Sequence, residues 1–168
     1  MPLNIFSISH TEAIKMVAAV IEKASTDGGN SVAVAVVDYA GRLVAFTAMD
    51  NTMPASNKLA QSKAYSAVIG KKDTIQWAST KKHPENIDFD MRNWTDKNFT
   101  CFTGGVIISF NNQIIGGIAV SGRKGMRGDN DILMQDNELA EYGRSFLKSL
   151  NDENLSDPEI NFTNRFNA

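Results

Sequence analysis

The sequence is poor in cysteine, histidine and proline, and each scarcity narrows what the protein can be. It has one cysteine, Cys101, in 168 residues, which excludes an intramolecular disulfide and makes a reduced compartment the simplest setting. Residues 1–6 lack the basic start and apolar core of a signal peptide. No apolar run approaches the roughly 18 residues that a membrane-spanning helix needs. We therefore expect a cytoplasmic protein with no membrane partner.

An excess of charge of either sign is also missing. The chain carries 17 basic and 19 acidic residues, for a net charge of −2, and no basic stripe, so we expect no nucleic-acid partner. Its two histidines and one cysteine offer no metal-ligand or triad spacing. The acidic stretch 129–138 lacks the spacing of an EF-hand loop. We therefore expect no metal site.

The residues that are present predict a regular alternation of helices and strands. Ser9 and Glu12 form a capping box that begins a helix over residues 10–27, whose apolar face includes Ile14 and Val17. Asn111 and Asn112 separate two apolar runs and predict a tight hairpin turn, since asparagine tolerates positive φ. The further predicted helices are 55–69 and 132–150, and the predicted strands are 32–37, 43–49, 106–110 and 114–120.

This order predicts a single α+β domain in which helices pack on the faces of an antiparallel sheet. The 42% of hydrophobic residues suits one ordinary core. The segment 71–103 shows no period, which is typical of a functional cover or a partner-contacting arm.

Five stretches resemble motifs of one known family. They are VAVVD (34–38), AQSKAYSA (60–67), GGV (104–106), GGIAVSG (116–122) and QDNELAEYG (135–143). In this order, across about residues 9–150, they resemble the GlcG/HbpS/PduO-C-terminal family of haem-binding-like proteins. The resemblance implies a profilin-like α/β sandwich over residues 1–150 that assembles as a homodimer or a larger homo-oligomer. Members are tied to haem binding or degradation, glycolate use and cobalamin-linked diol metabolism, so the activity stays open.

The chain also departs from the family pattern. Ile107 stands where the family has proline, and Thr47 and Ala48 replace an arginine that could bind an acidic ligand. The segments 75–103 and 123–131 differ most, so we expect them to carry any private substrate preference. The polar tail 151–168 contains Phe162 and Phe166, which are expected to contact a partner subunit because so few apolar residues form no core alone.

Lys63 is the strongest candidate for a chemical role. It lies in a stripe of alanines on the predicted helix 55–69, where a lysine either reaches solvent along its stem or points into a pocket to meet an anion. Asp50 lies between a strand and this helix, so it serves either as a turn residue or as a carboxylate that faces Lys63. Arg123 begins a glycine-rich loop and either holds a carboxylate or is simply solvated.

The pocket is expected between the helix 55–69 and the glycine-rich end of the hairpin. Gly104, Gly105 and Gly122 would leave room there, and three aromatic side chains would form apolar walls. Those are Trp94, Phe99 and Phe102. His10 and His83 are the two imidazoles that could bind haem iron, and each is equally well explained as an exposed residue.

Two functions remain open at this level. One is a binding protein for a small molecule, such as haem, another tetrapyrrole or a small organic acid, with haem as the candidate cofactor. The other is a cofactor-free enzyme that acts on a small acid or carbonyl compound, with Lys63 and a carboxylate such as Asp50 as general acid and base.

Overall fold

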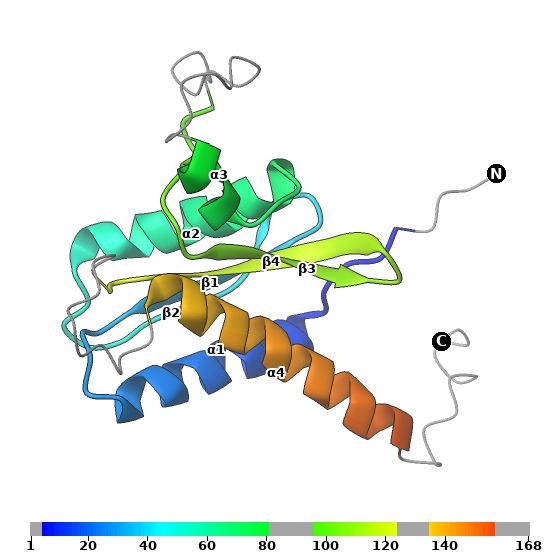
Figure 1. The fold of residues 1–168 in the computed structure, drawn as a ribbon. Helices are drawn as coiled ribbons and strands as arrows, with labels where there is room; N and C mark the ends of the chain where they lie inside the picture. Colours follow the sequence, from blue (N-terminus) through cyan, green and yellow to red (C-terminus); the bar gives the residue numbers. More distant parts are fainter. Residues whose placement is uncertain (1–4, 81–95, 124–134, 157–168) are drawn as a thin grey trace.

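The computed structural model describes residues 5–80, 96–123 and 135–156 (Figure 1). The elements are α1 (His10–Thr26), β1 (Ala33–Asp38), β2 (Leu43–Ala48), α2 (Pro54–Ile69), α3 (Thr74–Thr80), β3 (Gly105–Phe110), β4 (Gln113–Ser121) and α4 (Asp136–Ser156). The four predicted strands and the first two predicted helices are confirmed to within one or two residues at each end. His83 and Trp94 lie outside the described residues.

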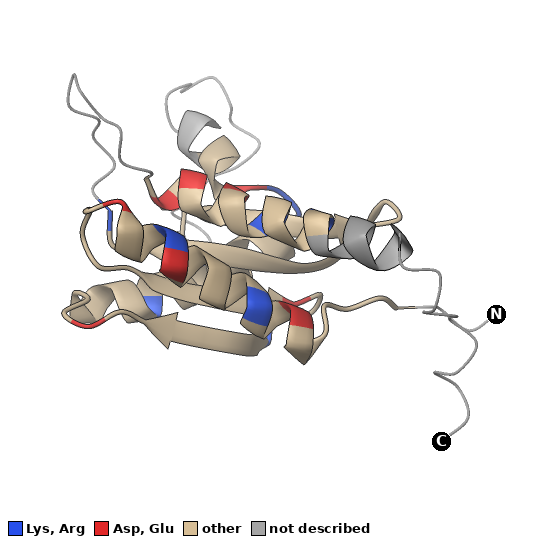
Figure 2. Ribbon diagram, turned by 90° about the horizontal axis from the view of Figure 1, so that it is seen from below, with Lys and Arg blue, Asp and Glu red and all other residues tan. Residues whose placement is uncertain are grey.

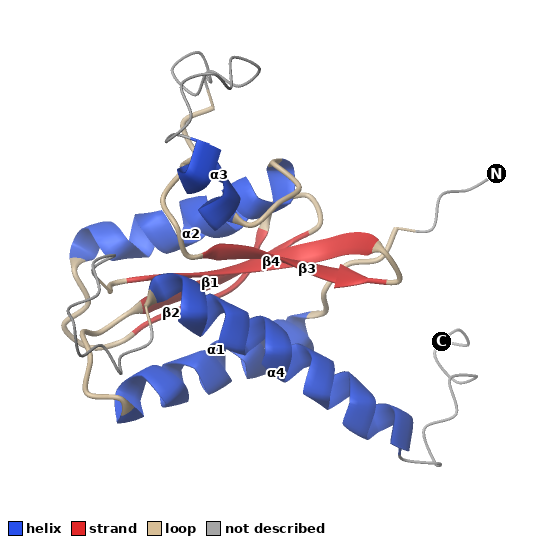
Figure 3. Cartoon of the chain, viewed as in Figure 1, coloured by secondary structure: helices blue, strands red, loops and turns tan. Residues whose placement is uncertain are grey.

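The strands form one antiparallel sheet in the order β2-β1-β4-β3. Helices α1 and α4 cover one face of this sheet, and α2 and α3 cover the other (Figure 3). The α+β fold with helices on both faces of an antiparallel sheet is therefore confirmed. On the face that carries α1 and α4, acidic and basic residues are interspersed along both helices (Figure 2). No helix among the described residues combines the length and apolarity needed to cross a membrane.

The core has two halves because the side chains of a strand alternate between its faces. All six residues of β1 are buried. Val34 and Val36 join the larger cluster beneath α1 and α4, while Ala33 and Ala35 pack with alanines of α2. Because small residues meet there from both sides, the backbone of α2 approaches the sheet closely. This close approach brings Lys63 of α2 to the end of β4.

Local signals in the sequence give the ends of two elements. The Ser9 side chain accepts a hydrogen bond from the Glu12 backbone N–H at 3.2 Å, and the Glu12 carboxylate accepts one from the Ser9 N–H at 2.9 Å, so the capping box is confirmed. Asn111 and Asn112 have φ values of 46° and 63°, the left-handed conformations that a two-residue hairpin turn requires. Ile14, however, is 48% exposed, because the buried face of α1 centres on Met16, Val17 and Val20.

Two helices differ from the prediction. Helix α3 lies inside the segment predicted to be irregular. The sequence does not predict it because seven residues are too few to show a helical period. Helix α4 runs to Ser156, six residues into the predicted tail. The apolar pattern ends near Leu150, but residues 151–156 contain no proline or glycine, and the next proline is Pro158.

The core of α1 can be tested with two substitutions on one helix. Met16 is fully buried, so Met16→Ala should lower the free energy of unfolding by about 2–5 kcal/mol through lost burial and a cavity. Ile14→Ala removes a similar volume from an exposed site and should cost far less. Urea denaturation followed by circular dichroism measures both values. Equal losses in the two variants would contradict this burial pattern.

Candidate functional site

A cavity of about 480 Å³ opens at the sheet end where β3 begins and β4 ends. This volume lies within the range of about 300–1,000 Å³ that small-molecule sites occupy. The lining combines α2, α3, the loop before β3, the end of β4 and the first turn of α4. Its residues are Lys63, Ile75, Phe102, Thr103, Arg123, Gln135, Asp136, Asn137 and Glu138.

A buried ion pair forms one wall of the cavity. The Lys63 Nζ donates a hydrogen bond to Asp136 Oδ2 at 2.7 Å and another to the Val120 carbonyl at 3.0 Å. The second carboxylate oxygen of Asp136 accepts from the Arg123 backbone N–H at 2.9 Å. Lys63 is only 3% exposed. The pair therefore joins α2 to α4 and to the end of β4, and both carboxylate oxygens have donors.

The glycines before β3 make room for this pair. Gly104 has a φ of +111°, and a Cβ there would lie 2.7 Å from both the Asp136 Cβ and the Val120 carbonyl oxygen. A Cβ on Gly105 would lie 2.4 Å from the Lys63 carbonyl oxygen. Both glycines lie beside the ion pair, but neither is among the residues that line the cavity, and the space that they leave is filled by the chain's own backbone and side chains.

The environment of Lys63 weakens its hold on a proton. Burial lowers the pKa of its ammonium group because the charged form loses hydration, while the charge of Asp136 and its hydrogen bond act in the opposite direction. The loss of hydration is the larger effect, so the pKa of Lys63 lies below its usual value.

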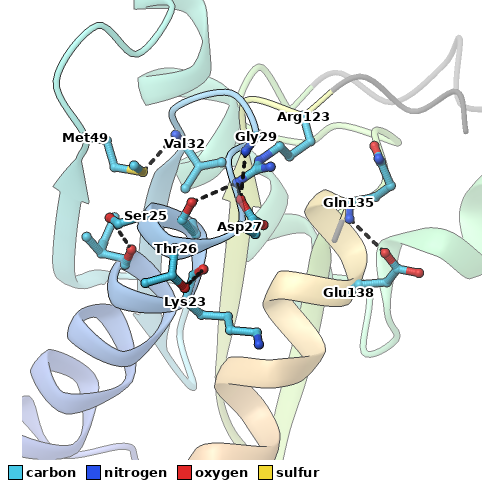
Figure 4. A network of polar contacts seen from close by, with 12 residues as sticks. Lys23, Ser25, Thr26, Asp27, Gly29, Val32, Met49, Arg123, Gln135 and Glu138 are labelled. Carbon is cyan, nitrogen blue, oxygen red and sulfur yellow. Dashed lines mark hydrogen bonds and ion pairs between the residues drawn. The ribbon is translucent and has the colours of Figure 1, made fainter. Parts of the chain in front are cut away.

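Arg123 lines the cavity, but its side chain is bound to the end of α1 (Figure 4). Its Nη2 donates to Asp27 Oδ1 at 2.8 Å and to the Ala24 carbonyl at 3.2 Å. The guanidinium lies against Gly29, where a Cβ would fall 1.2 Å from Nη1. Burial tends to raise the pKa of Asp27, but hydrogen bonds from Arg123 and the Gly29 N–H outweigh it, so this pKa is lowered.

Asp50 is not the carboxylate that meets Lys63. It is exposed in the turn after β2, and β2 lies at the opposite edge of the sheet from β3. Lys63 instead lies over β4 and binds Asp136, the first residue of α4. The expected pair of Lys63 with a carboxylate is present, but the carboxylate is that of Asp136 and not that of Asp50.

Of the two described aromatic residues that were predicted to form apolar walls, Phe102 lines the cavity and Phe99 does not. Phe102 lines the cavity and is 62% exposed. Phe99 stacks edge-on against Trp77, with ring centroids 5.8 Å apart, and is not among the lining residues. Gly122, with a φ of +147°, leaves room for the Ser31 carbonyl oxygen, which would lie 2.3 Å from a Cβ. That space serves the packing of the backbone.

Neither histidine is part of the described lining. His10 is exposed on the first turn of α1, whereas Arg123 binds the other end of this helix. The 17 residues of α1 separate the two ends by roughly 25 Å. Among residues 5–80, 96–123 and 135–156, no cluster of three histidine, cysteine or acidic side chains could hold a metal ion.

The residues that sequence reasoning missed come mainly from α3 and α4. Ile75 lies on the unpredicted helix α3. Asp136, Asn137 and Glu138 fall within the stretch 135–143 that carried the family resemblance, as Lys63 falls within 60–67. Both halves of the ion pair were therefore visible as motif residues. Their contact was not, because 73 positions separate them.

Comparisons with known proteins agree with this fold. A model of the family described as "Haem degrading protein HbpS-like" matches residues 8–137. Protein GlcG of Escherichia coli (strain K12) is 32% identical over 115 residues, which cover 68% of this chain and 81% of GlcG.

Two solved structures extend the comparison to three dimensions. Protein ORFY of Klebsiella pneumoniae, a DUF336 protein, superposes with a TM-score of 0.75 at 26% identity, over 88% of this chain and 95% of ORFY. The complex of PduOC with haem superposes with a TM-score of 0.69, over 83% of this chain and 94% of PduOC. Its 22% identity makes the second likeness one of fold.

The lowered pKa of Lys63 can be measured directly. Carbon-13 NMR of the lysine ε-carbons should show Lys63 titrating below an ordinary lysine. Between its folded and unfolded pKa values the unfolded chain binds more protons, so the free energy of unfolding should rise with pH across that window. Lys63→Met should abolish this contribution.

Asp136→Asn is the matched control, because it keeps the size of the side chain and removes the charge. Without that charge, burial is less opposed, so the pKa of Lys63 should fall further. A Lys63 that titrates at or above the usual value would contradict this account of the site.

Proposed function

This chain belongs to the HbpS-like family of haem-degrading proteins, and on that premise we propose that it binds a small organic ligand of the haem type in the cavity between α2, α3 and α4. The observation that carries the proposal is the combination of a cavity of about 480 Å³ with a buried ammonium group in its wall. The ligand class that fits is an apolar body with a carboxylate, which includes tetrapyrroles and smaller organic acids.

The polar end of the cavity suits a carboxylate. An ammonium group has three N–H donors, and the bonds of Lys63 to Asp136 and Val120 use two of them. The third is available for a ligand oxygen. The first turn of α4 lies in the same wall, and the N–H groups at a helix start favour anions. Asp136 limits this attraction, because it already balances the charge of Lys63.

The apolar end suits the body of the ligand. Phe102 and Ile75 line the cavity and are 62% and 45% exposed, so a flat ring system placed against them would be removed from water together with these side chains. Burying a phenylalanine side chain contributes about 1.5–3 kcal/mol. We therefore expect Phe102 to contribute strongly to affinity.

Haem itself fits this site in part. The described lining offers contacts for a macrocycle and for a propionate. It contains no histidine, cysteine, methionine or tyrosine, the side chains that usually bind haem iron. The proposal therefore concerns the organic part of the ligand, and no iron coordination is assigned to the described residues.

Proton transfer is a second candidate function, favoured by the buried Lys63 beside Asp136. A lysine whose pKa is lowered is better suited to act as a general base near neutral pH. In such a cofactor-free enzyme, Lys63 would accept a proton from a small acid or carbonyl substrate and Asp136 would hold the resulting ammonium. Turnover without haem, abolished in Lys63→Met, would favour this function over simple binding.

Binding is tested by titrating the protein with haemin and, separately, with iron-free protoporphyrin IX. If the site holds the macrocycle, both ligands should bind saturably and with affinities within about tenfold of each other. Phe102→Ala should weaken both at least about tenfold, since each 1.4 kcal/mol changes an equilibrium constant tenfold. Absorbance and tryptophan quenching report the binding.

Phe110→Ala is the matched control, because Phe110 is another exposed phenylalanine, 46% accessible, at the opposite end of β3. It should leave both affinities unchanged. Binding of haemin without protoporphyrin would contradict a site that holds the organic part, as would equal affinities in Phe102→Ala and the unchanged chain.

We also propose that the chain self-associates, as expected from the two phenylalanines of its C-terminal segment. Phe162 and Phe166 lie outside the described residues, so this proposal rests on the sequence alone. Burying two such side chains against a partner would contribute about 1.5–3 kcal/mol each.

Multi-angle light scattering at micromolar concentration should give at least twice the mass of one chain. Replacing both Phe162 and Phe166 by serine should lower that mass or weaken the association. A monomer before substitution would refute self-association, and an unaffected oligomer after it would refute the role of these two residues.

A further inference from the structure

Among the strands that the structure describes, none pairs with the outer edge of β3. In the order β2-β1-β4-β3, β3 has β4 on one side only. The Val120 N–H donates to the Gly104 carbonyl at 2.9 Å, and inward and outward pairs alternate along an antiparallel ladder. The N–H and C=O groups of Gly105 and Ile107 therefore point away from β4.

Side chains satisfy all four of these outward groups. The Gly105 N–H donates to Thr74 Oγ1 at 2.9 Å, and the same hydroxyl donates to the Gly105 carbonyl at 3.2 Å. The Ile107 N–H donates to Asp73 Oδ1 at 2.8 Å, and its carbonyl accepts from Arg144 Nη1 at 3.3 Å. Each outward residue thus meets one acceptor and one donor, as it would from a neighbouring strand.

These side chains come from opposite faces of the sheet and support one another. Asp73 and Thr74 lead into α3 above the sheet, and Arg144 comes from α4 on the other face (Figure 1). Arg144 Nη1 lies 3.1 Å from Asp73 Oδ2, so the donor and acceptor for Ile107 form an ion pair around the strand edge. Thr74 is fully buried.

We propose that Asp73, Thr74 and Arg144 act together as a surrogate strand that closes the β3 edge against strand pairing by a second copy of this chain. Such protection answers a real hazard, because β3 contains the consecutive apolar residues Val106, Ile107 and Ile108, and exposed apolar edge strands template association. Within the described residues, no side chain forms a hydrogen bond of this kind to the backbone of β2, the strand at the opposite edge.

Amide hydrogen exchange tests the closure in the unchanged protein. The Gly105 and Ile107 amides should be protected to within about tenfold of the Val106 and Ile108 amides, which face β4. If Gly105 and Ile107 instead exchange at the rates of open edge amides, the surrogate strand does not exist in solution.

Substitutions separate the role of Thr74 from that of Asp73. Thr74→Val keeps the shape and removes the hydroxyl, so it should lower protection of Gly105 at least tenfold and leave Ile107 less affected. Asp73→Ala should do the reverse. Asp73→Asn keeps an acceptor oxygen and removes the charge, so Ile107 should stay better protected than in Asp73→Ala. Protection that is the same in all three variants would overturn the assignment.

Sedimentation velocity tests the consequence for association. The double variant Asp73→Ala with Arg144→Met, checked for native circular dichroism, should form species larger than those of the unchanged chain as concentration rises. Arg42→Met is the control, because it also breaks an arginine–aspartate pair but on an exposed turn, where Arg42 is 72% exposed. Identical sedimentation of a folded double variant and the unchanged chain would overturn the proposal.

Discussion

The buried contact between Lys63 and Asp136 holds together the parts of the molecule on which the cavity depends. Helices α2 and α4 lie on opposite faces of the sheet, and this ion pair joins them around the end of β4. Taking two charges out of water is costly, and removing one partner of such a pair typically costs about 3–5 kcal/mol. The Val120 carbonyl and the Arg123 N–H offset the cost of taking these charges out of water, because they give each charge a further hydrogen bond. Gly104 is required in turn, because any side chain there would collide with the pair.

The same end of the sheet contains a second buried ion pair, in which Asp27 balances the charge of Arg123. Its bond to Asp27 connects the end of β4 to the end of α1. Lys63 and Arg123, the two cations that the sequence predicted as ligand contacts, are thus each bound by a carboxylate of the chain. A ligand of the proposed kind would meet balanced charges and directed N–H groups in this cavity, so its selectivity would come from shape and hydrogen-bond direction more than from net charge.

The features that sequence reasoning captured are local or periodic. The capping box at Ser9 and the turn at Asn111 and Asn112 depend on residues within a few positions of each other, and the two-sided burial of β1 follows from its unbroken apolar run. The residues of the site depend on contacts between distant positions. Nothing in the spacing from Lys63 to Asp136 reveals their contact, and Asp50 fits equally well as a turn residue or as a partner of Lys63 on sequence alone. The direction of the Arg123 side chain depends on Gly29, almost a hundred positions away. Helix α3 is too short for its sequence to show a helical period.

The two edges of the sheet have unequal capacities for association. An edge-to-edge filament needs two open edges on every chain, because each copy must pair with one neighbour through each edge of its sheet. In this molecule the side chains around β3 occupy one edge, so backbone pairing is left with β2. Two copies that pair through β2 would present only occupied edges to the solution. Growth by this route would end at a closed pair with twofold symmetry, so larger assemblies would have to use surfaces other than the sheet edges.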